Sequence, residues 1–216
     1  MAEPVPPGRF ITLEGGEGAG KSTQARRLAA WLGERGIDCL LTREPGGSPG
    51  AEDIRTLLVT GEPGRWDAVT EALLMNAARR DHVVRTIRPA LAAGTWVICD
   101  RFFDSTLAYQ GYAGGVPLAT LRAFIDAAVG DTRPDLTLIM DMDPDTGLAR
   151  AHGGGSGAET RFERKGTAFH TAVREGFRTL AGDEPRRCAV IDAGRSVEDV
   201  AAAIAGAVAE RLGVAA

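Results

Sequence analysis

Residues 15–22 read GGEGAGKS and fit the pattern G-x-x-x-x-G-K-[ST]. The apolar residues 10–14 before this stretch predict a buried strand, and the apolar spacing in residues 22–35 predicts a helix after it. Glycines let backbone N–H groups turn inward toward phosphate oxygens, and a helix N-terminus adds partial positive charge. Lys21 is expected to reach the β- and γ-phosphates, and the Ser22 hydroxyl to bind Mg²⁺. A glycine-rich turn without a ligand is the alternative, and the strand, the Lys-Ser pair and the helix together argue against it.

The rest of the chain alternates apolar runs with amphipathic segments. Further buried strands are expected at residues 37–42, 95–100, 136–141 and 188–192. Further helices are expected at residues 71–93, 118–129 and 197–212. The apolar runs are continuous, as in strands covered on both faces, and their alternation with helices favours a parallel sheet with right-handed crossovers. We therefore expect an α/β fold of the P-loop NTPase type, with three layers and five parallel strands.

The chain length and two glycine- or proline-rich segments predict the domain organisation. A length of 216 residues suits one domain, expected to span residues 9–216. Residues 1–8 contain three prolines and no apolar segment, so we expect a disordered tail rather than a signal peptide. Residues 152–157 are almost all glycine and serine, which predicts a mobile lid over residues 150–166. No apolar stretch reaches about eighteen residues, so we expect no membrane span and a cytoplasmic location.

Net charge and cysteine spacing argue against two other classes of protein. The net charge of −4 gives no overall attraction for nucleic acid. Cys39, Cys99 and Cys188 lie far apart, without the CxxC or Cys/His spacing of a zinc site. We expect reduced thiols inside the core and no nucleic-acid partner.

The third expected strand ends in Asp100, and Arg101 follows directly. An acid and a base at the carboxyl end of one strand suit a site that holds both Mg²⁺ and a second phosphate group. Arg101 could bind that phosphate through its planar guanidinium, although a solvated strand end is the alternative. The chain contains neither N-K-x-D nor D-x-x-G, which argues against a GTPase. A phosphotransferase and a non-kinase ATPase remain open on these residues alone.

Several strings together resemble the bacterial thymidylate kinase family. They are GGEGAGKS at residues 15–22, TREPGG at 42–47, AARR at 77–80, DRFFDSTLAYQG at 100–111 and PDLTL at 134–138. The resemblance runs from about Arg9 to the last expected helix. It implies transfer of the γ-phosphate of MgATP to dTMP, giving dTDP and ADP, by an enzyme that is typically a homodimer packed through helices. A P-loop kinase for another small acceptor is the nearest alternative, and a non-kinase ATPase is a more distant one. The presence of Lys21, Ser22, Glu17, Asp100 and Arg101 argues against a catalytically silent homologue.

The resemblance also implies an acceptor site. Glu17 matches the acid that holds the 3′-hydroxyl of the acceptor sugar, and Arg79 matches the arginine that reads the thymine carbonyl. Tyr109 would crowd the 2′ position and so reject ribonucleotides, and Met75 stands where the family usually stacks a phenylalanine on thymine. The whole set expected to bind the acceptor is Glu17, Pro45, Arg55, Met75, Arg79, Arg101, Ser105, Thr106, Tyr109 and Gln110.

The resemblance further implies a donor site and a lid cation. Because residues 15–22 contain no arginine, the cation near the transferring phosphoryl group is expected in the lid, at Arg161 with support from Arg150. The loop at residues 193–195 is expected to border the adenine. The residues expected to bind the nucleotide are Gly15, Gly16, Glu17, Gly18, Ala19, Gly20, Lys21, Ser22, Arg150 and Arg195. The expected metal ligands are Ser22 and Asp100, and the expected catalytic residues are Lys21, Arg101, Glu17 and Arg161.

Overall fold

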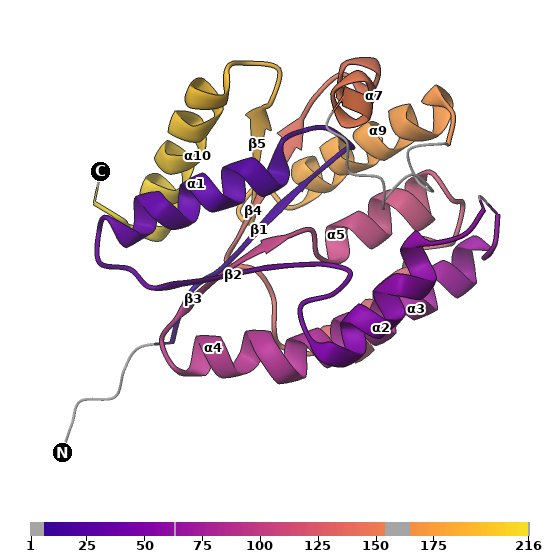
Figure 1. Ribbon diagram of the computed structural model, residues 1–216, viewed down its shortest axis with the longest axis horizontal. Helices are drawn as coiled ribbons and strands as arrows, with labels where there is room; N and C mark the ends of the chain where they lie inside the picture. The colour runs from indigo at the N-terminus through magenta and orange to yellow at the C-terminus, as the bar shows by residue number, and fades with distance from the viewer. Residues whose placement is uncertain (1–6, 63, 154–164, 216) are drawn as a thin grey trace.

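A parallel sheet of five strands forms the centre of the molecule (Figure 1). The computed structural model describes residues 7–62, 64–153 and 165–215. The strands are β1 (Phe10–Gly15), β2 (Cys39–Arg43), β3 (Trp96–Asp100), β4 (Leu136–Asp141) and β5 (Cys188–Asp192), and they lie in the order β2-β3-β1-β4-β5. Every neighbouring pair is parallel. The predicted five-stranded parallel sheet is confirmed, with strand bounds shifted by no more than two residues.

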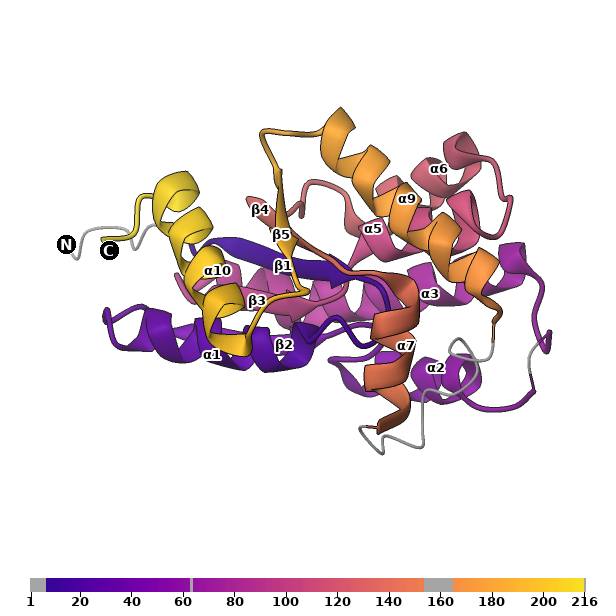
Figure 2. The ribbon, with the colours of Figure 1, turned by 90° about the horizontal axis from the view of Figure 1, so that it is seen from above.

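Helices cover both faces of this sheet, which confirms the three predicted layers (Figure 2). Helices α1 (Lys21–Gly33) and α10 (Val197–Leu212) pack on one face through apolar residues such as Leu28 and Ile204. Helices on the other face enclose a second core around Phe10. The remaining helices are α2 (Pro49–Val59), α3 (Ala68–His82), η1 (Val83–Ile87), α4 (Arg88–Ala92), α5 (Phe103–Thr106), η2 (Leu107–Tyr112), α6 (Leu118–Val129), α7 (Pro144–Gly153) and α9 (Thr167–Asp183).

The single helix predicted at residues 71–93 is three consecutive segments in the structure. Helix α3 begins earlier, at Ala68, because the side chain of Asp67 caps it by accepting a hydrogen bond from the backbone N–H of Thr70. The π-helical turn η1 then precedes α4, whose second residue is Pro89. Proline has no N–H to donate to the carbonyl four residues earlier, so the chain takes a wider turn here.

Two predicted segments fall largely outside the described residues. Of the tail predicted at residues 1–8, the structure describes residues 7 and 8, and the backbone N–H of Gly8 donates to Leu91. Of the lid predicted at residues 150–166, residues 154–164 lie outside the described part. Within the described ranges, no helix has the length and apolar character needed to cross a membrane.

Candidate active site

The carboxyl ends of β1, β2 and β3 bring three loops together at one edge of the sheet (Figure 1). The register places Asp100, the last residue of β3, beside Leu13 of β1 on one side and Arg43 of β2 on the other. The loops that follow these strands therefore meet although they are far apart in the sequence. Such an edge is where open α/β sheets bind ligands.

These loops and helices enclose a cavity of about 370 Å³. Sixteen of the residues expected in the site line it: Glu17, Gly18, Gly20, Lys21, Ser22, Pro45, Arg55, Met75, Arg79, Asp100, Arg101, Ser105, Thr106, Tyr109, Gln110 and Arg150. Gly15 and Gly16 line a small neighbouring cavity instead, and the Ala19 side chain is buried in the core. Arg195 pairs with Asp192 on the exposed surface, and Arg161 lies outside the described residues.

The loop at residues 15–22, which we call the phosphate-binding loop, positions Lys21 inside this cavity. The Nζ of Lys21 donates to the carbonyl oxygens of Gly15 at 3.2 Å and Gly16 at 2.6 Å, so the ammonium group lies over the loop. Gly20 has a φ of 83°, which places it in the left-handed region that glycine adopts without strain, directly before α1 begins. Burial lowers the pKa of Lys21, an effect that Glu17 and Asp100 oppose. A buried cation beside the start of a helix is suited to bind the terminal phosphates of a nucleotide.

Ser22 and Asp100 form the candidate metal site. The hydroxyl of Ser22 donates to Oδ2 of Asp100 across the gap between α1 and the end of β3. No group of three or more His, Cys, Asp or Glu side chains suited to a metal occurs within the described residues. One hydroxyl and one carboxylate nevertheless fit Mg²⁺, which in nucleotide sites takes few protein ligands and completes its shell with phosphate oxygens and water.

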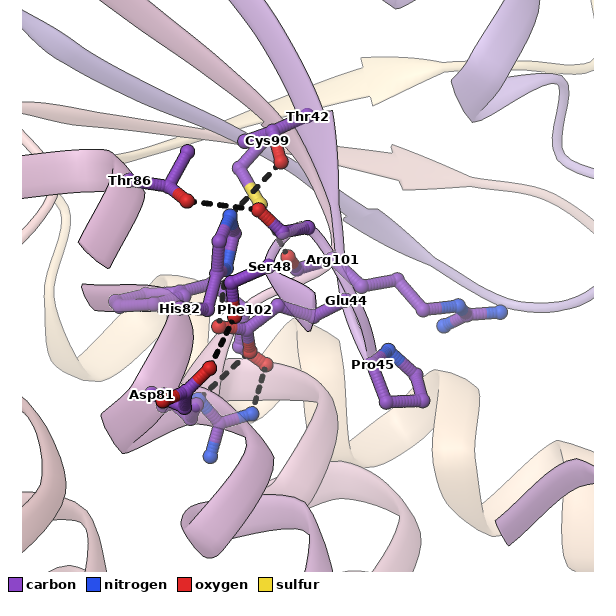
Figure 3. Close-up of polar contacts among 12 residues, drawn as sticks. Thr42, Glu44, Pro45, Ser48, Asp81, His82, Thr86, Cys99, Arg101 and Phe102 are labelled. Atoms are coloured by element: carbon purple, nitrogen blue, oxygen red, sulfur yellow. Dashed lines mark hydrogen bonds and ion pairs between the residues drawn. The ribbon is translucent and has the colours of Figure 1, made fainter. Parts of the chain in front are cut away.

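Arg101 adopts a strained backbone conformation at the centre of the cavity. Its φ is 69°, and no other described residue except glycine has a positive φ. The thiol of Cys99 donates to the carbonyl oxygen of Arg101 at 3.0 Å, and Figure 3 shows both residues at the end of β3. The carboxyl oxygens of Glu14 accept the backbone N–H of Phe102 at 2.8 Å and the hydroxyl of Ser105 at 2.6 Å. These contacts fix the turn that directs the Arg101 guanidinium toward the phosphate-binding loop.

Glu17 connects the phosphate-binding loop to the opposite wall of the cavity. Its Oε1 accepts hydrogen bonds from Nη2 of Arg101 at 3.0 Å and from the hydroxyl of Tyr109 at 2.7 Å. Burial by itself would raise the pKa of Glu17, but Arg101 and Lys21 outweigh it and lower that pKa to about 2. Glu17 therefore stays ionised, and it counters the positive charge of two cations that would otherwise repel each other.

Arg79 forms the buried wall of the cavity opposite the phosphate-binding loop. Its side chain is 2% exposed, and its Nε donates to Oε2 of Glu44 at 2.8 Å. Its two Nη atoms donate to Oδ1 of Asn76 at 2.9 Å, to Oγ1 of Thr106 at 3.2 Å and to the carbonyl oxygen of Phe102 at 3.1 Å. These contacts hold the guanidinium in one orientation, which prepares it for directional recognition of a ligand.

A buried histidine, His82, links strand β2 to the loop that follows it (Figure 3). Nε2 of His82 lies 2.8 Å from the hydroxyl of Thr42, and Nδ1 lies 3.1 Å from Oε1 of Glu44. Glu44 thus contacts His82 with one oxygen and Arg79 with the other. Pro45, next in the chain, lines the cavity. Helix α3 and this loop are therefore held together by charged groups at the place where the acceptor is expected.

Gln110 lies on η2, where the π-helical turn directs it toward α3. Its Nε2 donates to Oε2 of Glu71 at 3.2 Å, and both side chains are buried. Met75 also lines the cavity. The polar groups of Arg79, Thr106 and Gln110 thus meet around one part of the cavity.

Arg150 of α7 joins the other end of the cavity to the loop after β5. Its Nη1 donates to the carbonyl oxygen of Ala193 at 3.3 Å. The loop expected to border the adenine therefore contacts a residue that lines the cavity.

Sequence reasoning missed several residues that hold the site. Glu44 stands inside the TREPGG string, and His82 lies one helical turn after Arg79. The sequence position of each residue was therefore a signal that it could belong to the site. Glu14 and Glu71 carried none, because each is an isolated acid whose partner is distant in the chain. Only the folded arrangement of β1, α3 and η2 gives them a role.

Comparison with known proteins gives consistent matches over most of the chain. A family model described as Thymidylate kinase matches residues 13–204. The chain is 56% identical to the thymidylate kinase of Caulobacter vibrioides, over 96% of this chain and 99% of that protein. It is 52% identical to the thymidylate kinase of Bradyrhizobium sp. (strain ORS 278), over 95% of this chain and 91% of that protein. A crystal structure of thymidylate kinase from Ehrlichia chaffeensis is similar with a TM-score of 0.76 and 36% identity, over 94% of this chain and 99% of that one.

Proposed function

The chain belongs to the thymidylate kinase family, and from that membership we propose how its own residues divide the reaction among themselves. The protein catalyses the ATP-dependent phosphorylation of dTMP to dTDP. One observation carries the assignment of residues: the phosphate-binding loop and a set of oriented arginines face each other across a single cavity. Two anionic substrates can be held there with their reacting phosphates adjacent.

On the donor side, the backbone N–H groups of the loop at residues 15–22 and the Nζ of Lys21 would bind the β- and γ-phosphates of ATP. Ser22 and Asp100 would hold Mg²⁺, which neutralises charge on the phosphates when bound. Arg150 and the loop that contains Ala193 would border the adenine, which the hydrogen bond between them supports. Arg195 would reach the nucleotide from the same loop, where it forms an ion pair with Asp192 on the exposed surface.

On the acceptor side, Arg79, Thr106 and Gln110 would contact the thymine, and Met75 would pack against its ring. Their common position along the cavity supports this assignment. Pro45 and Arg55 would close the same end, since Nη1 of Arg55 donates to the carbonyl oxygen of Pro45 at 2.5 Å. Tyr109 would lie against the 2′ position of the sugar, and Glu17 would accept the 3′-hydroxyl.

In the transfer step, an oxygen of the dTMP phosphate attacks the γ-phosphorus of ATP in line with the leaving ADP. Arg101 and Ser105 would hold the acceptor phosphate. Arg101 also contacts Glu17 and so lies beside the phosphate-binding loop. Lys21 and Arg101 would stabilise the charge on the transferring group, and positioning supplies most of the rest. Arg161 and the lid at residues 150–166 remain proposals from sequence, in which closure adds a cation and excludes water.

We further propose a homodimer that packs through α3. Along this helix and into η1, Val69, Leu73, Ala77 and Val84 are all exposed, at intervals of four, four and seven residues. We call these four residues the exposed stripe. This spacing places them on one face of a helix, and an apolar stripe in water is suited to a second copy. The remaining proposals are a single domain over residues 9–216, a cytoplasmic location and the lack of a nucleic-acid partner, the last supported by the net charge of −4.

The assignment is tested with a panel of nucleoside monophosphates, ATP and Mg²⁺, using wild type, Lys21→Ala and Arg101→Ala. Wild type should phosphorylate dTMP in preference to other monophosphates and need the metal. Each variant should lose at least about a hundredfold in kcat, because a cation at the transferring group is removed, while circular dichroism shows an intact fold. Near-normal turnover in either variant would contradict its role.

A further inference from the structure

Glu71 is a buried acid behind the base end of the cavity. It lies in the first turn of α3 and is 2% exposed. Nε2 of Gln110 donates to its Oε2 at 3.2 Å. Gln110 lines the cavity, whereas Glu71 does not. Glu71 therefore contacts a residue of the pocket from the side that faces away from the ligand.

This contact selects one of the two orientations of the Gln110 amide. A carboxylate offers acceptor oxygens, whereas an amide has a donor half and an acceptor half. With its NH₂ group toward Glu71, Gln110 has its carbonyl oxygen left for the cavity. The reverse orientation would place an amide oxygen against a carboxylate oxygen in a buried place, where two acceptors without a proton between them are strongly unfavourable.

The orientation matters because pyrimidine bases differ at N3. In thymine and uracil N3 carries a hydrogen and donates, whereas in cytosine N3 accepts. A carbonyl oxygen in the pocket matches the first kind of base and repels the second. We propose that Glu71 is a specificity-determining positioning residue, which holds the Gln110 amide oxygen toward the base and so disfavours cytosine nucleotides. The proposal rests on the proposed function, in which Gln110 contacts the base.

The test is Glu71→Gln, measured by kcat/KM for dTMP, dUMP and dCMP. A glutamine at position 71 can donate to or accept from Gln110, so both amide orientations become accessible. The dTMP value should then fall by no more than about twofold, because the productive orientation keeps about half of the population. The dCMP value should rise about tenfold, since the penalty on the reversed amide is removed. The ratio of dTMP to dUMP should stay unchanged, because both bases carry the N3 hydrogen.

A gain with dCMP distinguishes positioning from structural damage, which would lower all three values together. Asp67→Ala is the matched control: it removes the N-cap of the same helix without touching Gln110, and it should leave the dTMP to dCMP ratio unchanged. Arg79 is present in every variant, so its own preference between the bases cancels from the comparison. If Glu71→Gln does not fold, Glu71→Met keeps a similar side-chain volume, removes the acceptor and should lower the same ratio.

Gln110→Ala separates failure of this inference from failure of the proposed function. If Gln110→Ala loses selectivity between dTMP and dCMP but Glu71→Gln retains it, Glu71 does not set the amide and the inference is wrong. If neither variant changes selectivity, Gln110 does not contact the base. The proposed acceptor pocket is then wrong as well.

Discussion

At the scale of single residues, this site depends on buried or partly buried acids that each fix the position of a cation or a dipole. Glu17 lies between Arg101 and Tyr109, Glu44 holds Arg79, and Glu71 holds Gln110. Substrates that carry several negative charges need oriented donors, and a donor in a low-dielectric cavity keeps its direction only if a buried acceptor holds it. In the proposed site, these acids would therefore contribute to substrate recognition through the groups whose positions they fix.

Glu14 gives a prediction for stability against pH. It is fully buried at the end of β1, and burial together with the nearby Asp104 raises its pKa from 4.5 to about 8. Between these two values the folded protein binds a proton that the unfolded chain does not. The free energy of unfolding should therefore fall as pH rises through this interval, by up to about 1.4 kcal/mol per pH unit from this group. Glu14→Gln is neutral in both the folded and the unfolded state. The difference in unfolding free energy between this variant and wild type should therefore shift in favour of the variant as pH rises from 5 to 8, as measured by urea unfolding.

The control for this prediction is Glu198→Gln. Glu198 is an exposed acid that pairs with Arg27 on the surface, so its replacement should shift the unfolding midpoint little at any pH. Parallel stability profiles for wild type and Glu14→Gln would mean that Glu14 is already ionised in the folded protein.

Sequence reasoning identified most residues that line the cavity and few of those that hold them. Lys21, Ser22 and Arg101 stand in local strings whose spacing is typical of direct contact with a ligand, so they could be proposed without a structure. A supporting residue such as Glu71 needs only a distant partner, and 39 positions separate it from Gln110. No local pattern constrains such a pair, because strand order and helix packing decide which residues meet.

At the scale of elements, α7 is packed unusually close to the phosphate-binding loop. A Cβ added at Gly18 would lie 1.9 Å from the carbonyl oxygen of Gly147, and one added at Gly147 would lie 2.4 Å from the carbonyl oxygen of Glu17. The two backbones are thus in direct contact, with glycine on both sides. Because α7 also carries Arg150, a shift of this helix would be transmitted to both the loop and the donor end of the cavity.

Gly147→Ala should therefore disturb ATP binding although residue 147 does not line the main cavity. The added methyl group would push the loop at Glu17, since a close-packed backbone contact cannot absorb it, at a cost of about 1–3 kcal/mol. We expect KM for ATP to rise at least about tenfold, measured in steady-state kinetics at saturating dTMP.

The matched control for this substitution is Gly206→Ala on α10. A Cβ at residue 206 would meet no atom within 4 Å, so this variant should gain about 0.5–1 kcal/mol in helix stability with unchanged kinetics. Equal KM values for ATP in wild type and Gly147→Ala would show that the close contact is not needed for binding.

The sequence also predicted the regular elements better than the irregular ones. Strand and helix periodicity located all five strands and at least one helix on each face, because burial imposes it directly, but helices α2, α7 and α9 were not predicted. The π-helical turns η1 and η2 were missed, since no apolar period distinguishes a π turn from the α-helix around it. Yet η2 carries Tyr109 and Gln110. The least regular part of the fold thus supplies part of the proposed acceptor site.

At the scale of the whole molecule, the order of the strands brings residues that are distant in the sequence into one site. Loops after β1, β2 and β3 carry the donor groups, the Glu44–Pro45 segment and Arg101, and they meet because these strands are adjacent and parallel. Helix α3 completes the site with Met75 and Arg79 on its inner face. Its outer face carries the exposed stripe, so a partner docked there would stiffen the helix that is proposed to read the base.

The proposed homodimer is tested by Leu73→Lys, which places a charge at the centre of the exposed stripe. Leu73 is 50% exposed in the single chain, so the substitution should not unfold it, but a buried lysine without a partner would be unfavourable in an interface. Sedimentation velocity at micromolar concentration should give the mass of two chains for wild type and of one chain for Leu73→Lys.

The control is Val190→Lys, which changes an equally exposed residue (52%) on the edge strand β5, away from α3, and should remain dimeric. The monomeric variant should also bind dTMP less tightly, because α3 loses its support. A wild type that sediments as one chain would contradict the dimer, whereas dimeric Leu73→Lys would move the interface to another face.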